Sequence, residues 1–344
     1  MQPAAMPNAE REQFYKRIDP LNLAPLWEAR RNVPPHPASS CVPALWRYAD
    51  AQPHLMRACE LITAREAERR VLMLENPGLR GSSFITKSLY AGWQVILPGE
   101  IAPSHRHTAN ALRFVIEGEG AYTAVDGERT TMRPGDFVIT PSWTWHDHGN
   151  LGSGPVVWLD GLDTAIVWLF DAAFRENYPE EAQPLAREEG DALARYGNNL
   201  LPVDYETKAR HSPILSYPYE RSRETLATLA RNQDVHPSHG IKMRFVNPTT
   251  GGDPFPTIAA FMQWLPRGFA GKSYRATDGA VFSVVEGCGK VTVGDKTFEF
   301  SKHDTFVIPS WHAYAFATDE ECVLFSFSDR AAQKALGIWR EQYD

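Results

Sequence analysis

The residues best suited to chemistry in this chain are three histidines in two short stretches. His105 and His107 are separated by one residue, and His146 follows about forty residues later. If the first pair lies on a β-strand, both imidazoles project from the same face, because side chains alternate along a strand. Turn signals at residues 126–127 and 133–135 are typical of antiparallel strands between the two stretches. Three converging neutral imidazoles predict a site for a divalent first-row metal with open coordination positions.

The spacing around these histidines resembles the two-part signature of the cupin family. The first half of that signature is a glycine, five further residues and a His-x-His pair, and Gly99 precedes His105 at this distance. The second half places glycine, proline, histidine and asparagine at set intervals, matched here by Gly135, Pro141, His146 and Asn150. Trp143 is the one mismatch, at a position where the family usually has glycine.

The metal ligands differ from those of most cupins in one respect. Most metal-binding members carry a glutamate seven residues before the glycine that ends the strand, and counting back from Gly118 this position is Ala111. The resemblance therefore implies three histidines without a carboxylate. Arg113 lies two residues further along the same strand face. Because a cation beside a metal dication is unfavourable unless an anion joins them, we expect an anionic ligand that binds both.

Length and composition limit the class of protein. The 344 residues suit two domains of ordinary size, and 43% apolar residues allow a large buried core. A formal net charge of −7 argues against a nucleic-acid partner. No apolar run approaches the length of a membrane span, so we expect no membrane association. The four cysteines have no CxxC or framework spacing, which favours reduced thiols and a cytoplasmic protein.

Short strand patterns with a turn signal about every ten residues predict a mainly β protein. We expect a helical N-terminal arm over residues 1–75, a metal-binding cupin over 76–170, a helical connector over 171–240 and a degenerate second cupin over 241–344. This is a bicupin: two double-stranded β-helix (jelly-roll) barrels in one chain.

The second barrel is expected because segments of the first one repeat at an offset of 168 to 169 residues. Residues 113–118 correspond to 281–287, and residues 137–143 correspond to 306–311. Through this offset, the partners of the three histidines are Tyr274, Ala276 and Tyr314. The second barrel is therefore predicted to have lost its metal site. His303 and His312 lie nearby but out of register, and we interpret them as structural.

Longer stretches resemble the gentisate 1,2-dioxygenase family, which includes salicylate and 1-hydroxy-2-naphthoate dioxygenases. The resemblance rests on residues 64–77, 105–118 and 143–150 and extends over nearly the whole chain. Members are cytosolic Fe(II) enzymes, typically homotetramers, that open an aromatic ring between the carboxyl-bearing carbon and the adjacent hydroxyl-bearing carbon. The resemblance implies that this chain converts gentisate and O2 to maleylpyruvate, with Fe(II) held by the three histidines.

Three arginines are candidates for binding the acidic substrate. Arg113 is expected to hold the substrate carboxylate through charge-assisted hydrogen bonds. Arg65 and Arg69 are four residues apart, so they share a face if their segment is helical. Such a charged run is usually a solvated surface, but the resemblance places both side chains in the substrate pocket.

Three further side chains are candidates for catalysis. His148 is expected on the same strand face as His146, either as a hydrogen-bond donor or acid–base group or as a residue that orients a metal ligand. Gln94 lies on a predicted strand next to the metal, where it could bond the substrate or O2. Asp160 is the candidate partner of the 5-hydroxyl of gentisate, and the alternative is a turn acid at a strand end.

Several alternatives are compatible with the sequence. The substrate could be salicylate or 1-hydroxy-2-naphthoate, although Asp160 favours gentisate because its second hydroxyl gives a carboxylate a partner. Three histidines also suit zinc, so a zinc hydrolase or a zinc or manganese isomerase is possible. A bicupin that binds a ligand without catalysis is a third alternative, since fold does not determine function.

Overall fold

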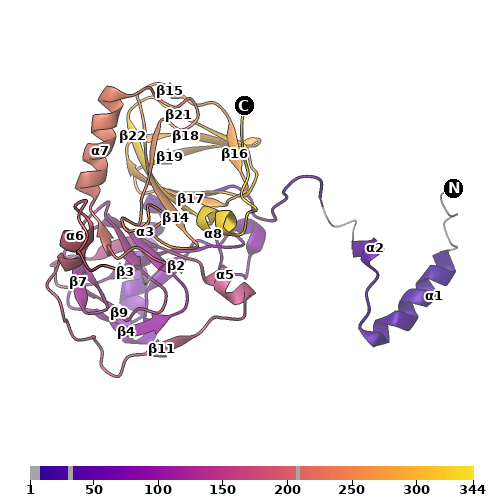
Figure 1. Ribbon diagram of the computed structural model, residues 1–344, viewed down its shortest axis with the longest axis horizontal. Helices are drawn as coiled ribbons and strands as arrows, with labels where there is room; N and C mark the ends of the chain where they lie inside the picture. The colour runs from indigo at the N-terminus through magenta and orange to yellow at the C-terminus, as the bar shows by residue number, and fades with distance from the viewer. Residues whose placement is uncertain (1–7, 30–33, 207–209) are drawn as a thin grey trace. The chain divides into compact units, whose positions relative to one another are not determined.

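The computed structural model describes residues 8–29, 34–206 and 210–344 (Figure 1). It divides into two compact units, Met1–Ala38 and Ser39–Asp344. The described part of the first unit is helical and consists of α1 (Asn8–Ile18), the 3₁₀-helix η1 (Asp19–Leu21) and α2 (Leu26–Ala29).

Side-chain contacts of Tyr15 link α1 and α2 within the first unit. The hydroxyl of Tyr15 donates a hydrogen bond to Glu28 at 2.6 Å and accepts one from the indole N–H of Trp27 at 2.8 Å. The helical start expected for the arm is therefore present, whereas residues 1–7 and 30–33 of that expectation lie outside the described residues.

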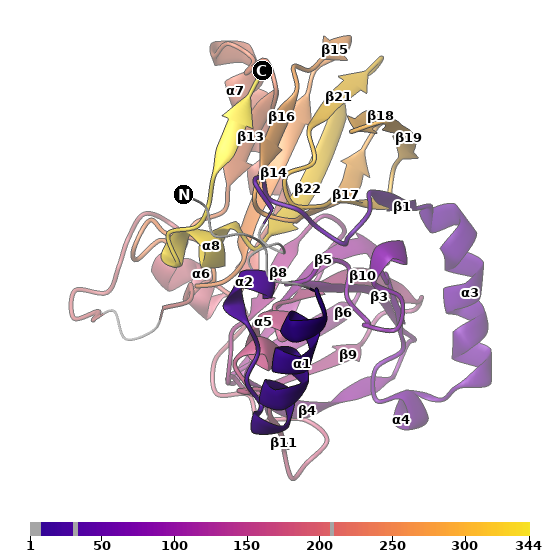
Figure 2. The same ribbon diagram turned by 90° about the vertical axis from the view of Figure 1, so that its right-hand side faces the viewer.

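The second unit contains two barrels of antiparallel strands, which confirms the mainly β bicupin prediction (Figures 1 and 2). The first barrel has the sheets β12-β8-β5-β10-β3-β2 and β11-β4-β9-β6-β7. Its strands are β2 (Val71–Met73), β3 (Tyr90–Ile96), β4 (Ile101–His107), β5 (Ala111–Glu117), β6 (Ala121–Val125), β7 (Glu128–Thr131), β8 (Phe137–Thr140), β9 (His146–Asn150), β10 (Val156–Leu162), β11 (Arg175–Asn177) and β12 (Ser216–Tyr217).

The second barrel has the sheets β1-β20-β17-β22-β14-β13 and β19-β18-β21-β16-β23, with β15 paired to β21. Its strands are β1 (Ala44–Trp46), β13 (Ile241–Arg244), β14 (Ala259–Leu265), β15 (Phe269–Ala270), β16 (Tyr274–Ala276), β17 (Ala280–Glu286), β18 (Cys288–Val293), β19 (Lys296–Ser301), β20 (Thr305–Ile308), β21 (Tyr314–Thr318), β22 (Cys322–Ser328) and β23 (Glu341–Tyr343).

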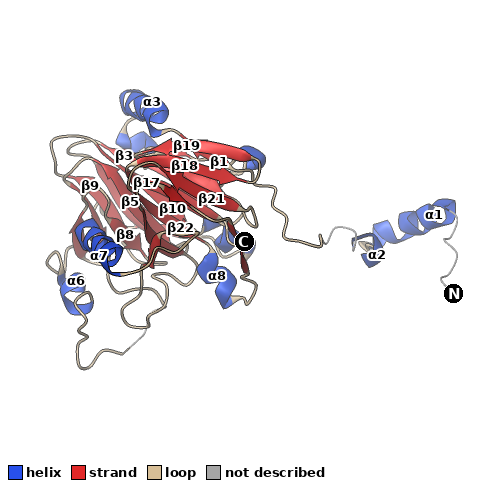
Figure 3. Ribbon diagram, turned by 90° about the horizontal axis from the view of Figure 1, so that it is seen from above, coloured by secondary structure: helices blue, strands red, loops and turns tan. Residues whose placement is uncertain are grey.

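The helices of the second unit lie outside the sheets, as Figure 3 shows for α3, α7 and α8. They are α3 (Tyr48–Leu61), α4 (Ala64–Ala67), η3 (Pro77–Leu79), α5 (Thr164–Leu169), α6 (Asp191–Tyr196), α7 (Tyr219–Asn232) and α8 (Arg330–Ala335). Among the described residues, no helix is long and apolar enough to cross a membrane. All four cysteines are free thiols; Cys41 and Cys322 are buried, but Cys288 is exposed.

Two predicted turns set the register of the strands that carry the site. Asp126 and Gly127 both have positive φ, of 44° and 85°, and join β6 to β7 as a two-residue hairpin loop. This backbone matches the twist of antiparallel strands and favours Asp-Gly. Gly135 has a φ of 86° in the turn that leads into β8. Both turns lie between the His-x-His strand β4 and the strand of His146, β9.

The two barrels share one hydrophobic core. The rings of Phe114 on β5 and Phe325 on β22 are parallel, with centroids 4.2 Å apart, and Phe137 on β8 lies 5.5 Å from Phe325. All three side chains are fully buried within the same apolar cluster. Because this cluster combines residues from both barrels, neither barrel buries its apolar surface without the other.

Each barrel also receives a strand from the segment that precedes the other barrel. β1, which precedes the first barrel, pairs with β20 of the second, and β12, which precedes the second barrel, pairs with β8 of the first. A helix follows each of these strands: α3 after β1 and α7 after β12. The duplicated unit therefore includes a leading strand and helix, and the two copies are interlocked.

The first residues of α3 and α7 also connect the two barrels. The backbone N–H of Tyr48 donates to Asp304 of the second barrel at 2.8 Å, and its hydroxyl donates to Glu117 of the first at 2.8 Å. Tyr219 makes the same pair of contacts with the barrels reversed, its N–H to Asp136 at 2.8 Å and its hydroxyl to Glu286 at 2.5 Å.

The segments expected as a helical arm and a helical connector thus contain strands as well. β1 and β2 lie within residues 1–75, and β11 and β12 lie within residues 171–240. β2 lies where the sequence predicts a strand, over residues 71–75. β1, β11 and β12 have only two or three residues, too few for a recognisable alternation, which is why the sequence did not indicate them. They are defined by their partners in the barrels.

The interior of the second barrel is filled by aromatic side chains. Tyr274, Ala276 and Tyr314, the partners of the three histidines, belong to its buried apolar cluster. The ring of Phe282 lies 5.5 Å from that of Phe316 and 6.2 Å from that of Tyr314. Where the first barrel has imidazoles, the second has two tyrosine rings and an alanine, which offer no metal ligand of the histidine type.

We expect Phe325→Ala to destabilise the protein by about 3–5 kcal/mol, because it leaves a cavity in the core that both barrels share. Urea unfolding of the metal-free protein measures this change. Phe170→Ala is the control, since Phe170 is 65% exposed and its removal should cost less than about 0.5 kcal/mol. Equal stability of the two variants would contradict a shared core.

Candidate metal centre and the pocket beside it

The three predicted metal ligands converge inside the first barrel. His105 and His107 lie on β4, and His146 begins β9, directly opposite His105 in the strand pairing. The register of β4 and β9 shifts between Ala102 and His105, and such a bulge turns the side chains that follow it. One nitrogen of each ring lies within 4.8 Å of the others. A single ion between them can therefore contact all three.

Backbone carbonyls orient each ring. The Nδ1 atoms lie 3.2 Å from the carbonyl of Pro103 (His105), 2.8 Å from that of Ala109 (His107) and 2.9 Å from that of Thr144 (His146). A carbonyl only accepts hydrogen bonds, so these contacts favour a proton on Nδ1 and a free lone pair on Nε2.

Burial keeps these imidazoles neutral. It is the largest cause that lowers the pKa of His105 to about 3 and the pKa of His107 to about 4. Burial and the two neighbouring histidines also lower the pKa of His146 well below its usual value. A metal binds the unprotonated ring. Three neutral imidazoles with free Nε2 atoms fit a divalent first-row metal.

Arg69, which follows α4, contacts two residues of β4, Pro103 and the metal-ligand candidate His105. Its Nη2 lies 2.9 Å from the carbonyl of Pro103 and 2.9 Å from Nδ1 of His105. A guanidinium only donates, so the contact with His105 requires an unprotonated Nδ1. This is the opposite tautomer from the one in which Nε2 binds a metal. The bond to Pro103 is compatible with both tautomers.

Arg113 lies in the barrel interior on β5 and is 4% exposed. Its Nη1 donates to the hydroxyl of Thr140 at 2.5 Å, and its Nη2 lies 2.9 Å from Nε2 of His148. The nearest carboxylate is Asp160, whose Oδ1 is 3.7 Å from Nε of Arg113. Burial lowers the pKa of Arg113 and Asp160 raises it. The predicted cation is therefore beside the histidines, with only one incomplete ion pair.

Asp160 lies on β10, paired with Arg113 across the sheet. Its Oδ1 accepts a hydrogen bond from the indole N–H of Trp158 at 2.9 Å. Burial raises the pKa of Asp160 to about 6, against the opposing effect of the Arg113 cation. A carboxyl with this pKa can exchange a proton near neutral pH.

Comparison with known proteins agrees with this geometry. The family model described as "Cupin domain" matches residues 92–162. The chain is 55% identical to gentisate 1,2 dioxygenase 1 of Aquipseudomonas alcaligenes over 96% of each sequence. It is 34% identical to a 1-hydroxy-2-naphthoate 1,2-dioxygenase of Nocardioides sp., over 99% of this chain and 89% of that protein.

A crystal structure of salicylate 1,2-dioxygenase from Pseudoaminobacter salicylatoxidans, an adduct with gentisate, matches with a TM-score of 0.91 and 34% identity. The match covers 100% of this chain and 96% of that one. This chain belongs to the gentisate 1,2-dioxygenase family. The structure contains the features on which the resemblance was based: the barrel, the group of three histidines and the arginine on the neighbouring strand.

The other predicted residues differ in their placement. Gln94 on β3 is buried and pairs with Trp158, so it faces the same barrel interior as Asp160. Arg65 is exposed on α4, a single turn that begins with a Thr63–Glu66 capping box. It lines an open groove together with Arg69 and His105. The structure thus places Arg65 at the outer edge of the site.

His148 contacts a different group from the one considered in the sequence. It is fully buried on β9, and both of its ring nitrogens have partners: Nε2 with Arg113 and Nδ1 with the hydroxyl of Thr123 at 3.0 Å. Among the described residues it orients the arginine and not a metal ligand.

Sequence reasoning missed three residues that lie near Arg113 and Asp160. Thr140 and Thr123 are buried partners of Arg113 and His148. Tyr90 pairs with Leu162 on β10, so it lies on the same sheet face as Asp160, and burial followed by the Asp160 charge raises its pKa. Strand register relative to Arg113 is the signal that identifies them, and it is visible only once the pairing is known.

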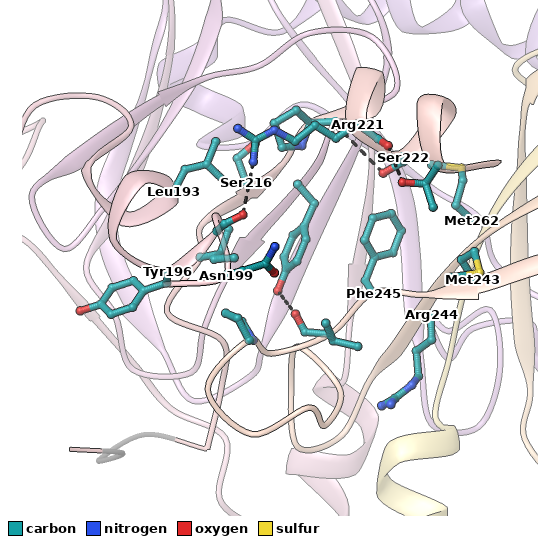
Figure 4. A pocket seen from close by; sticks show the side chains of 17 residues that line it. Leu193, Tyr196, Asn199, Ser216, Arg221, Ser222, Met243, Arg244, Phe245 and Met262 are labelled. Atoms are coloured by element: carbon teal, nitrogen blue, oxygen red, sulfur yellow. Dashed lines mark hydrogen bonds between the residues drawn. The ribbon is translucent and has the colours of Figure 1, made fainter. Parts of the chain in front are cut away.

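A second pocket lies outside the barrel interiors, between α6, α7 and β13 (Figure 4). Phe245, Met243 and Leu193 are among its lining side chains. Its described lining contains no histidine, cysteine, aspartate or glutamate. It therefore offers neither metal ligands nor an acid–base pair.

Replacement of either His105 or His146 by alanine should abolish metal binding and activity together, because two imidazoles hold a divalent metal far more weakly than three. Metal content by mass spectrometry and the rate of substrate-dependent oxygen uptake measure the two effects. His312→Ala is the control, since His312 belongs to the second barrel. Full metal content in His146→Ala would contradict the assigned ligands.

Proposed function

We propose that this protein is an Fe(II)-dependent dioxygenase that opens the ring of gentisate with O2 and forms maleylpyruvate. The observation that carries the proposal is the juxtaposition of three neutral imidazoles and the buried Arg113 guanidinium, whose charge acts on His107 and His146. An aromatic acid with an ortho-hydroxyl can contact both at once. Gentisate is favoured by the 55% identity to a protein named for that substrate.

Arg113 would bind the substrate carboxylate. Its Nε is buried without a hydrogen-bond partner among the described residues. A carboxylate can satisfy this N–H and also neutralise the cation that Asp160, at 3.7 Å, leaves incompletely paired. Arg69 adds positive charge near the outer side of His105. Together they select an anionic ligand.

Asp160 would hold the 5-hydroxyl of gentisate and accept its proton. Its carboxyl is buried in the same interior as Arg113, and its pKa of about 6 suits a base at neutral pH. Removing the hydroxyl proton increases the electron density of the ring. Gln94 on the neighbouring strand adds an amide that can hydrogen-bond the substrate or O2. The hydrocarbon walls around Trp158 exclude water from these groups.

His105, His107 and His146 would hold the iron through their Nε2 atoms, with the Nδ1–H of each ring donating to its backbone carbonyl. In that state Arg69 would keep its bond to the carbonyl of Pro103 and not the one to Nδ1 of His105. When bound, Fe(II) supplies a position for substrate oxygens and for O2, and it allows electrons to pass from the ring to O2. Because the three histidine ligands are neutral, they do not reduce the positive charge of the ion. An ion with its full charge would attract an anionic substrate more strongly than one held by a carboxylate.

The decisive experiment is oxygen uptake by iron-loaded protein with gentisate, salicylate and 1-hydroxy-2-naphthoate, compared with zinc- and manganese-loaded protein. Uptake with gentisate and iron is expected. Equal uptake with salicylate would refute a strict gentisate enzyme in favour of the relatives named for the other acids. No uptake and no change of any acid would support a binding protein. Conversion of an acid without oxygen uptake by the zinc- or manganese-loaded protein, followed by chromatography, would support the isomerase or hydrolase alternative.

Arg113→Met should keep its iron but raise the gentisate KM by about 100-fold, because it removes a charge-assisted contact of the carboxylate. Steady-state kinetics with metal analysis measure this split. Arg106→Met is the matched control, since Arg106 lies between two ligands in sequence but stacks on Trp143 and Trp145. An unchanged KM in Arg113→Met would remove Arg113 from this role.

The pH profile should reflect Asp160. Its folded-state pKa is raised to about 6, so the carboxylate is ionised above that pH and protonated below it. We expect kcat/KM for gentisate to fall as pH decreases through about 6. Asp160→Asn should be slow and lack this acidic limb. The control is Asp147→Asn, whose carboxylate contacts Gln183 instead. A limb retained in Asp160→Asn would assign it to another group.

We also propose that the protein is a cytoplasmic homotetramer. This rests on the family resemblance and on the absence of a disulfide framework in the cysteine spacing. Light scattering coupled to size-exclusion chromatography measures the mass, for which a tetramer of the 38.6 kDa chain is expected. Cell fractionation tests the location.

A further inference from the structure

A chain of hydrogen bonds crosses the interior of the first barrel and has Arg113 near its centre. At one end Thr140 on β8 accepts from Nη1 of Arg113. At the other end Nη2 of Arg113 contacts His148, and His148 contacts Thr123 on β6. Both threonines are 0% exposed. Neither belongs to the metal ligands or to the groups assigned to the substrate.

The donor and the acceptor of each hydrogen bond in this series follow from what each group can donate or accept. Arg113 only donates, so Nε2 of His148 must accept and its proton must lie on Nδ1. Nδ1–H then donates to the Thr123 oxygen at 3.0 Å, and the Thr123 hydroxyl donates to the sulfur of Met132 at 3.3 Å. Without the Thr123 oxygen, the buried Nδ1–H would lose its acceptor, and the other tautomer would direct an N–H toward the guanidinium.

Hydrogen bonds matter here because the one ion pair of Arg113 among the described residues, with Asp160, is a long one. Its separation of 3.7 Å from Asp160 exceeds a hydrogen bond, so Thr140 and His148 are the two groups in hydrogen-bond contact among the described residues. A buried cation held at two of its nitrogens has a defined orientation. Its remaining N–H groups, including Nε, stay available for another partner.

We propose that Thr140 and Thr123 are positioning residues that aim the Arg113 guanidinium at the substrate carboxylate. The inference rests on the proposed function, since it assumes that the carboxylate binds there. Thr140 acts directly on the guanidinium. Thr123 acts through His148, whose tautomer it selects. Misorientation of Arg113 weakens binding of the carboxylate in the ground state and the transition state alike, so it should change KM and leave kcat nearly constant.

The test uses Thr140→Val and Thr123→Val, which replace a hydroxyl by a methyl of similar size. We expect the gentisate KM, and the gentisate dissociation constant measured without oxygen, to rise about tenfold in Thr140→Val and several-fold in Thr123→Val. kcat should change by less than about twofold, with iron content unchanged. Thr140→Ser and Thr123→Ser retain the hydroxyl and should restore both constants.

Thr305→Val is the matched control, because Thr305 is a fully buried strand residue of the second barrel whose hydroxyl has no partner among the described residues. It should bind and turn over gentisate as the wild type does. In an Arg113→Met background, Thr140→Val should add no further loss of affinity, since its effect passes through that arginine.

Wild-type affinity in both valine variants would overturn the inference. So would a loss of iron or of kcat in parallel with affinity, or a full additional loss in the Arg113→Met background. Failure of the proposed function is distinguishable, because it appears as a wild-type protein that consumes no oxygen with gentisate. The anaerobic binding constants of the variants still test the two threonines in that case.

Discussion

A buried positive charge with incomplete neutralisation is the constraint on which the first barrel depends. Arg113 is 4% exposed, and its one neighbouring carboxylate is beyond hydrogen-bond distance at 3.7 Å. Burying an unpaired charge costs several kcal/mol, so the surroundings must provide hydrogen bonds. A metal dication on three neutral imidazoles adds further positive charge. An anion that contacts both relieves this imbalance, which is why the pocket suits an aromatic acid.

The interlocked barrels explain why a barrel without the histidines is retained. β1 completes a sheet of the second barrel, β12 completes a sheet of the first, and the stacked rings of Phe114 and Phe325 join their cores. The strands that carry Arg113 and Asp160 belong to the sheet that packs against the second barrel. The second barrel therefore supports the rigid wall of the active site, and its loss would expose that wall to water.

One backbone supports two opposite interiors. In the first barrel, imidazoles and a guanidinium are buried and linked by hydrogen bonds. In the second, the strand pairings place Phe282 where the first barrel has Arg113, and Phe316 lies where it has His148. The rings of Phe282 and Phe316 are 5.5 Å apart. The polar groups of the first interior are stabilised by hydrogen bonds, whereas the aromatic rings of the second are stabilised mainly by burial and ring packing. Duplication therefore allowed one copy to specialise in stability and the other in chemistry.

The sequence by itself indicated the duplication, through segments that repeat at a fixed offset, and its resemblance to the cupin signature implied the barrel fold and the three histidines. Strand alternation then placed Arg113 beside them. The sequence did not reveal the exchanged strands β1 and β12, the partner of His148, or the threonines on either side of Arg113. Those depend on which strands lie side by side and in what register, and a register is settled by packing between residues far apart in the chain. Tertiary structure alone decided that Arg65 lies at the outer edge and that His148 serves the arginine.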